Sequence, residues 1–429
     1  MPGSAKELQR RYHSARRRIA ALSSLREVLA LPKDRDLQPR QWKVIASQLA
    51  VREEQLAHRL KSAARAFLPL VHEPVSARRL NAALGALEFD LTQAFGFFDT
   101  YMDVLTQRHA PQVGRLLAGC DVLAWECIHR DHPALLIVEP PLVYCDRGFG
   151  ASTLREGVKL RDGVPNPLPL IQIPYSRLSE KCNLTSIYHE VGHEAMVRLG
   201  LIRSMPRAFR AALARAGAPG FVQDFYALWS FEIGPDYWAF GTSGLAAAGA
   251  IREILALPPS EVFRISAGDP HPPPDLRARL LTECCRQLWG AGIWDEWERN
   301  WQELYPPSAA PPGSRGPLRQ CREWIPLIAR ALRTTRYRVL GGRTIPDLFD
   351  LGALHPARLR APAAAHDSPE FRALSPAAQL AVFRLIKERG SLSENELDRV
   401  MTGWLSRLAS NRSIAPRAAV SIEEALEHA

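Results

Sequence analysis

The sequence contains no run of about 18 consecutive apolar residues, the length that a membrane-spanning helix needs. Its first 18 residues are rich in arginine and are not followed by the apolar segment of a secretory signal. These two absences predict that the chain neither spans a membrane nor enters the secretory pathway. We therefore expect a cytoplasmic location.

The sequence also lacks C-x-x-C cysteine pairs and has few lysines. The seven cysteines are odd in number, scattered and free of any C-x-x-C pair, so we expect reduced and mostly buried thiols rather than a zinc knuckle or a disulfide framework. Seven lysines stand against 48 arginines, and the net charge is +10. Because no stripe interleaves basic and aromatic residues and no nucleic-acid-binding motif is present, we expect a solvated basic surface and no nucleic-acid partner.

Hydrophobic periodicity predicts a mostly helical α+β fold. Residues 5–66 have the pattern of two long amphipathic helices that break near Leu31-Pro32, and residues 76–118 continue the helical pattern. Short β-type runs at 135–138, 142–145 and 168–173 predict a small mixed sheet, and the pattern is helical again from about 178. Proline-rich stretches then suggest the following division: an N-terminal helical region (1–118), a core with the small sheet (119–305), a helical extension after a proline-rich loop (306–360), and a C-terminal helical region with a flexible tail (361–429).

The sequence His-Glu-Val-Gly-His occupies residues 189–193 and lies in a segment with helical spacing of its apolar residues, Leu184 to Leu199. Asn183 or Thr185 is suited to cap the start of this helix, and Gly200 follows its end. The motif is therefore predicted to lie on a helix.

On a helix, His189 and His193 are four residues apart and face the same way, so both imidazoles can reach one metal ion. Glu190 is rotated toward the substrate side, where a general base is needed. The alternative is two surface histidines on an amphipathic helix. A hydrolytic Zn²⁺ site needs three protein ligands and an open position for water, so a third ligand has to come from elsewhere.

A metzincin is excluded because it would have Gly at position 196 and His at 199, where this chain has Met196 and Leu199. Downstream, Glu232 and Asp236 lie in an apolar, aromatic segment, and carboxylates in such surroundings need a partner. We expect Glu232 to be the third zinc ligand and Asp236 to accept a hydrogen bond from one of the ligating histidines. Glu253 is the reserve ligand.

This arrangement resembles that of the gluzincin peptidases. The segment His271-Pro-Pro-Pro-Asp-Leu-Arg277 is similar to the His-Pro-Pro-x-x-x-Arg segment of the CAAX prenyl protease and HtpX-type zinc peptidases, which also follows a Glu-x-x-x-Asp element. The resemblance covers about residues 168–280 and implies a zincin-like catalytic core. It also implies that His271 helps to hold the developing oxyanion and that Arg277 takes the place of that segment's arginine at the substrate site.

The chain departs from this family in two respects. It lacks the family's membrane-spanning helices, and Pro235 falls inside the Glu-x-x-x-Asp element. Because proline removes a helical hydrogen bond, we expect the helix to kink there or to restart with Pro235 in its first turn.

The β-type run 168–173 precedes the motif closely. Pro169 and Pro174 lack the amide hydrogen that a central strand donates, so they are expected at a sheet edge or at a strand end, and we expect the run itself to be an edge strand. In zinc peptidases generally the substrate backbone pairs with such a strand, so Ile171 and Ile173 are expected to line the cleft.

These patterns predict a zinc-dependent metallopeptidase that cleaves a peptide or protein substrate with a metal-activated water and Glu190 as general base. Two alternatives stay open. One is a non-catalytic scaffold with a structural zinc, in which the basic helices of 5–66 bind a protein partner. The other is a zinc hydrolase that acts on a non-peptide amide.

Overall fold

The structure is a computed structural model that describes residues 2–148, 150–160 and 163–410. The chain divides into two compact units. Unit 1 comprises residues up to Ala118 together with Glu139–Cys145 and Leu154–Leu170, and unit 2 comprises Gly119–Val138, Asp146–Thr153 and the chain from Ile171 onward. The tail predicted beyond residue 410 lies outside the described residues.

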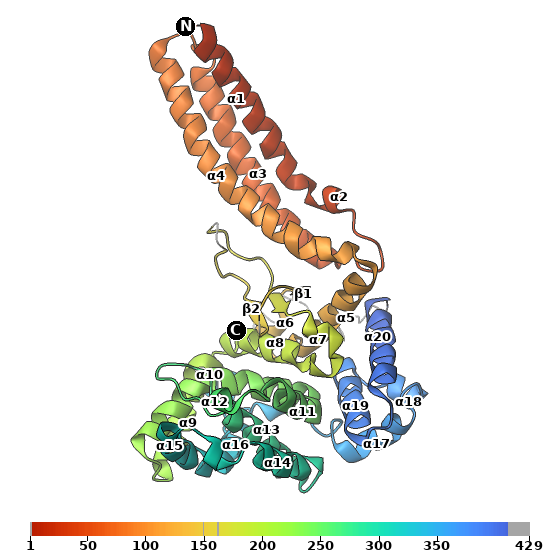
Figure 1. Cartoon of the computed structure of the whole chain (residues 1–429). Helices are drawn as coiled ribbons and strands as arrows, with labels where there is room; N and C mark the ends of the chain where they lie inside the picture. Colours follow the sequence, from red (N-terminus) through yellow and green to blue (C-terminus); the bar gives the residue numbers. More distant parts are fainter. Residues whose placement is uncertain (1, 149, 161–162, 411–429) are drawn as a thin grey trace. The chain divides into compact units, whose positions relative to one another are not determined.

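Unit 1 is built on three long helices that pack side by side, α1 (Pro2–Ala21), α3 (Pro39–Phe67) and α4 (Pro74–Thr106) (Figure 1). Their shared core follows the helical repeat. In α4 it contains Leu80, Leu84, Leu87 and Leu91, each at most 2% exposed. The expected break between the first two helices is confirmed by the short α2 (Leu25–Leu29) and the loop after it, whereas the single helical region expected at 76–118 is divided before Pro111, where α5 (Pro111–Ile128) begins.

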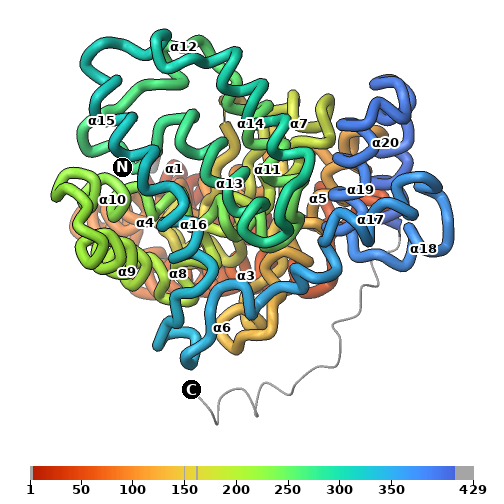
Figure 2. The backbone as a smooth tube through the Cα atoms, turned by 90° about the horizontal axis from the view of Figure 1, so that it is seen from below, coloured from red at the N-terminus to blue at the C-terminus, as the bar shows by residue number. Residues whose placement is uncertain are grey.

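Unit 2 is organised around α10 (Gly220–Ser243), which packs against α8 (Thr185–Arg198), α9 (Leu201–Arg215), α11 (Leu245–Ile254) and α13 (Pro274–Trp289) (Figure 2). The second half of α10 is buried on every side, as expected of a central helix. The remaining helices of unit 2 are α6 (Pro133–Leu136), α7 (Ser176–Ser179), α12 (Pro259–Val262), α14 (Ile293–Leu304), α15 (Pro312–Glu323), α16 (Ile325–Thr334), α17 (Pro356–Ala364), α18 (Pro369–Arg372), α19 (Pro376–Arg389) and α20 (Glu394–Ser410).

The small sheet has three strands, β1 (Leu142–Cys145), β2 (Ser152–Leu154) and β3 (Leu170–Ile173), in the order β1-β3-β2. A mostly helical chain with a small sheet is thus confirmed. The run 168–173 does form a strand, but the expectation that it lies at the edge is wrong, because β3 is central. The alternative, that the prolines mark strand ends, is confirmed, since Pro169 precedes the strand and Pro174 follows it.

The sequence also misassigned one strand and missed another. Residues 135–138 were expected to be β-type, but Leu135 and Leu136 belong to α6, which starts at Pro133 and is capped by the side chain of His132. The missed strand, β2, is three residues long, and such a length carries almost no periodic signal.

None of the helices in the described part of the chain is long and apolar enough to cross a membrane. The seven cysteines are free thiols, and all except Cys145 are buried.

Candidate metal centre

The helix that carries the motif, α8, begins at Thr185 after a short 3₁₀ turn. It has no side-chain cap, so the capping expected from Asn183 or Thr185 is wrong. The Asn183 carboxamide oxygen instead accepts a hydrogen bond from the buried guanidinium of Arg384, at 2.9 Å. The predicted end is confirmed, because Gly200 follows the helix with φ of 66°, a backbone conformation that glycine adopts without strain.

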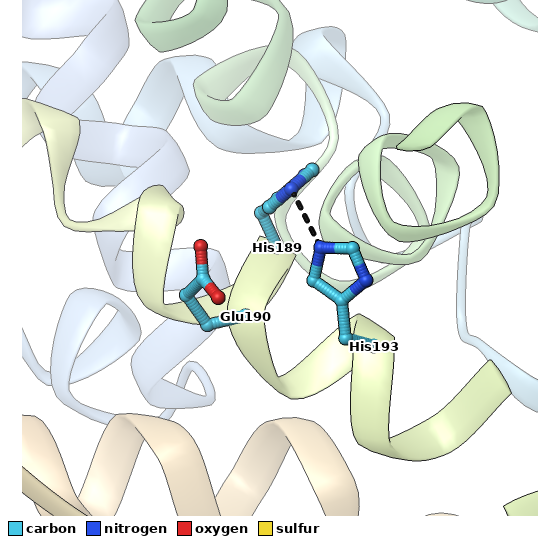
Figure 3. A group of neighbouring side chains, drawn as sticks. All are labelled: His189, Glu190 and His193. Carbon is cyan, nitrogen blue, oxygen red and sulfur yellow. Dashed lines mark hydrogen bonds between the residues drawn. The ribbon is translucent and has the colours of Figure 1, made fainter. Parts of the chain in front are cut away.

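The two motif histidines face each other from successive turns of α8, with the Glu190 carboxylate beside them (Figure 3). The Nε2 atoms of His189 and His193 are 3.2 Å apart. One ligand atom from each of His189, Glu190 and His193 lies within 4.8 Å of the others. The helical placement of the motif therefore brings these three side chains together.

Glu232 comes to the same point from α10. Its Oε2 lies 3.3 Å from Nε2 of His189, and its Oε1 lies 3.6 Å from Nε2 of His193. Four ligands about 2.0–2.2 Å from a tetrahedral zinc ion stand about 3.3–3.6 Å apart. The two imidazoles and the Glu232 carboxylate, which faces His189 with one oxygen and His193 with the other, thus form a triangle of side chains at separations that suit zinc.

Close packing of α8 on α10 sets this triangle. A Cβ on Gly192 would lie 2.8 Å from Cα of Pro235 and 3.1 Å from Cβ of Trp238, so only glycine allows the two helices to approach this closely. The helix α10 runs unbroken through Pro235, and the expected restart at this proline is wrong. Pro235 lacks an amide hydrogen, but it is buried against Gly192, and the continuous helix places Glu232 and Asp236 one turn apart.

Asp236 lies behind the triangle and is buried. Its Oδ1 is 2.8 Å from Nδ1 of His189, which is the hydrogen bond expected from the sequence. A proton held on Nδ1 leaves the Nε2 lone pair of His189 free to face a metal ion. The guanidinium of Arg277 donates to both oxygens of Asp236, at 2.8 Å and 2.7 Å, and lies 3.8 Å from Glu232.

The charged groups of this cluster shift one another's pKa values. Burial alone would lower the pKa of His189, but its hydrogen bonds and charge interactions with Asp236 and Glu232 outweigh burial and raise that pKa to about 10. Burial opposes ionisation of Glu232, yet His189 and Arg277 bring its pKa down to about 2, and Arg277 and His189 hold the pKa of Asp236 lower still. Burial and the neighbouring His189 charge lower the pKa of His193 to about 4. Both carboxylates are therefore anionic at neutral pH, and Arg277 balances the charge of Asp236, while Glu232 presents its carboxylate to the two imidazoles.

Glu190 is buried and makes a contact that the sequence did not predict. Its Oε2 lies 2.9 Å from the hydroxyl of Thr153 on β2. Burial raises the pKa of Glu190, and the charge of His189 and the Thr153 hydrogen bond oppose that rise. No sequence signal pointed to Thr153, because it lies 36 residues before the motif in a strand that periodicity did not detect.

His271 lies at the rim of the cluster, and its side chain is 59% exposed. Its Nε2 is 3.5 Å from Oε1 of Glu232, and its Nδ1 is 2.7 Å from Oδ1 of Asp269. The segment that follows is anchored by Asp275, which is fully buried and accepts hydrogen bonds from Arg279, Trp301 and Arg322. The three short motifs thus converge on one place in unit 2.

Other expected site residues have different surroundings. Ile171 and Ile173 are at most 1% exposed, so they belong to the core and do not line a cleft. Arg277 faces Asp236 rather than open space. The reserve ligand Glu253 is bonded to Arg384 and Lys387, which leaves Glu232 as the acidic residue against the two imidazoles.

Comparison of the chain with known protein families, with curated proteins and with solved structures finds no match. The functional argument therefore depends on the geometry and the chemistry of the site.

Proposed function

We propose that this protein is a zinc-dependent metallopeptidase. The observation that carries the proposal is the triangle of His189, His193 and Glu232. The two Nε2 atoms are 3.2 Å apart, and the Glu232 carboxylate lies 3.3 Å from His189 through one oxygen and 3.6 Å from His193 through the other. Three protein ligands with a buried carboxylate beside them are typical of a catalytic zinc site, which keeps one position open for water. The order of the motifs along the chain supports a zincin-like core of gluzincin type.

In this proposal the triangle holds the zinc ion, and Asp236 keeps the His189 ring in the tautomer that exposes Nε2. Zinc, when bound, supplies a Lewis acid that acidifies water and polarises a carbonyl group. Glu190 accepts the proton of the attacking water and then delivers it to the leaving amine. Arg277 neutralises Asp236 and fixes its two oxygens.

The strand expected to pair with the substrate, β3, is central and already has a neighbour on each side, so the substrate has to pair with another strand. In the order β1-β3-β2, the strand β2 is the edge strand opposite β1. Its residue Thr153 contacts Glu190, the proposed base. We assign the substrate to this edge, where an extended peptide would add a strand by backbone hydrogen bonds. An extended peptide fits this placement better than a small non-peptide amide.

A second candidate, a structural zinc centre, is favoured by one distance. His271 Nε2 lies 3.5 Å from Glu232, which is also a zinc ligand separation, and Asp269 holds its Nδ1. As a neutral imidazole, His271 would offer Nε2 as a fourth ligand and close the site. As an imidazolium, it would instead present an Nε2–H to a developing oxyanion, the role that the peptidase proposal gives it.

The test is hydrolysis of an unstructured protein such as casein by the zinc-loaded wild type and by Glu190→Gln. The peptidase proposal expects cleavage by the wild type and a loss of at least about 100-fold in Glu190→Gln, because the glutamine cannot accept the proton. Zinc content should be equal in the two proteins. Equal cleavage by both proteins would contradict the proposal, and a zinc-loaded wild type without cleavage would favour the structural centre.

A further inference from the structure

The hydroxyl of Thr153 contacts Glu190 at two places. Thr153 Oγ1 lies 2.9 Å from the carboxylate Oε2 and 3.0 Å from the backbone carbonyl oxygen of the same residue. A hydroxyl has one hydrogen to donate, so the two acceptors compete for it. The Glu190 carbonyl lies within α8, where it already accepts the helical amide four residues on. The charged carboxylate is the stronger acceptor, and the hydroxyl hydrogen therefore goes to Oε2.

This bond constrains the orientation of the carboxylate. A glutamate side chain has three rotatable bonds, and Thr153 is the side chain seen to hydrogen-bond this carboxylate. With Oε2 held toward β2 by Thr153, the other oxygen, Oε1, would be available to a water bound at the proposed zinc site. Glu190 lies within 4.8 Å of the ligand atoms of His189 and His193, which is about the distance that one intervening water spans.

The strand β2, which carries Thr153, is hydrogen-bonded to its neighbours. The neighbouring Ser152 hydroxyl donates to the side chain of Gln172 on β3, at 2.9 Å, and Gln172 donates to the backbone oxygen of Arg147, at 2.7 Å. These bonds tie Ser152, the first residue of β2, and the backbone of Arg147 to Gln172 of the central strand. Thr153 is thus presented by a strand of the sheet, which positions a side chain more tightly than a loop does.

We propose that Thr153 is a positioning residue that orients the Glu190 carboxylate toward the attacking water, an inference that rests on the peptidase function proposed above. Because β2 is also the edge assigned to the substrate, one strand supports both the peptide and the base. Binding a peptide along β2 would then stiffen the strand that orients Glu190, so that substrate and base are aligned together.

The test compares Thr153→Val, which keeps the shape but removes the donor, with Thr153→Ser, which keeps the hydroxyl. We expect Thr153→Val to retain one zinc per chain and a KM within about twofold of the wild type, and to lose about 10- to 100-fold in kcat, the usual effect of removing such a supporting bond. Thr153→Ser should recover most of that loss. Thr100→Val is the matched control, because its hydroxyl bonds only to the backbone of α4, and its kcat should be unchanged.

Crystal structures of the wild type and Thr153→Val supply a readout that does not depend on activity. The Glu190 carboxylate should occupy one rotamer in the wild type and a rotated or divided position in Thr153→Val. A carboxylate that stays in place, or a kcat that Thr153→Val leaves unchanged, would overturn the assignment of Thr153. If the wild type shows no hydrolysis, the proposed function fails, and the position of the carboxylate alone decides whether Thr153 orients Glu190.

Discussion

The bundle of α1, α3 and α4 buries apolar side chains, whereas the pair of α8 and α10 also buries charged ones. In the bundle, apolar side chains form the core and the charges stay outside, as in the pair of Arg18 and Glu88, whose side chains are 42% and 38% exposed. At the α8–α10 pair, charged groups are themselves buried, and Asp236 is only 4% exposed. The bundle follows from a repeat of leucines, whereas the candidate metal centre depends on a set of charges that are stable only together.

The largest difference between the two regions is expected when one carboxylate is removed from each. Asp236→Ala leaves the buried Arg277 charge without its partner and His189 without its acceptor, and such a break costs about 3–5 kcal/mol. Glu88→Ala breaks a half-exposed pair, which water screens, and should cost at most about 1 kcal/mol. The measurement is the free energy of unfolding in urea, with zinc removed from all proteins by a chelator so that metal binding does not contribute.

A loss of unfolding free energy in Asp236→Ala no larger than that in Glu88→Ala would contradict the proposed difference between the two regions. It would mean that water reaches Arg277 and compensates its charge. The stability of the remaining buried charges would then not depend on Asp236.

A smaller difference is expected from adding one methyl group to a helix in each region. Gly192→Ala places a Cβ 2.8 Å from the backbone of Pro235, and overpacking of this kind costs about 1–3 kcal/mol. Gly85→Ala on α4 meets no atom within 4 Å, so the better helix propensity of alanine should raise stability by about 0.5–1 kcal/mol.

Unfolding in urea measures both changes, and zinc affinity gives a second readout for α8. Gly192→Ala should also weaken zinc binding, because it pushes the two histidines away from Glu232. A stabilising Gly192→Ala variant with unchanged zinc affinity would show that the approach of α8 to α10 does not set the triangle.

The same contrast explains how much of the molecule the sequence predicts. The helices of the bundle, the motif helix and its end at Gly200 follow from periodicity and a glycine signal, both of which are local. The motif also predicts that His189 and His193 share one face, and the apolar setting of Glu232 and Asp236 predicts that they need partners. The structure brings all four side chains together.

What the sequence does not predict depends on partners distant in the chain. The place of β3 in the middle of the sheet depends on β2, and three residues give no detectable pattern. Arg277 was assigned to substrate because the sequence cannot show that Asp236 faces it, and Asn183 was expected to cap a helix because the sequence does not show that Arg384 lies beside it. The unbroken helix at Pro235 reflects tight packing against Gly192, which overrides the local preference of proline.

The central claim is that His189, His193 and Glu232 bind one zinc ion, and elemental analysis of zinc in the purified protein tests it most directly. The wild type, Glu232→Ala and Glu190→Gln should be compared after equal exposure to zinc and removal of the excess. The account predicts one zinc per chain in the wild type and in Glu190→Gln, and a lost or much weakened zinc in Glu232→Ala. A wild type that takes up no zinc, or a Glu232→Ala variant that binds it as tightly as the wild type, would contradict the account.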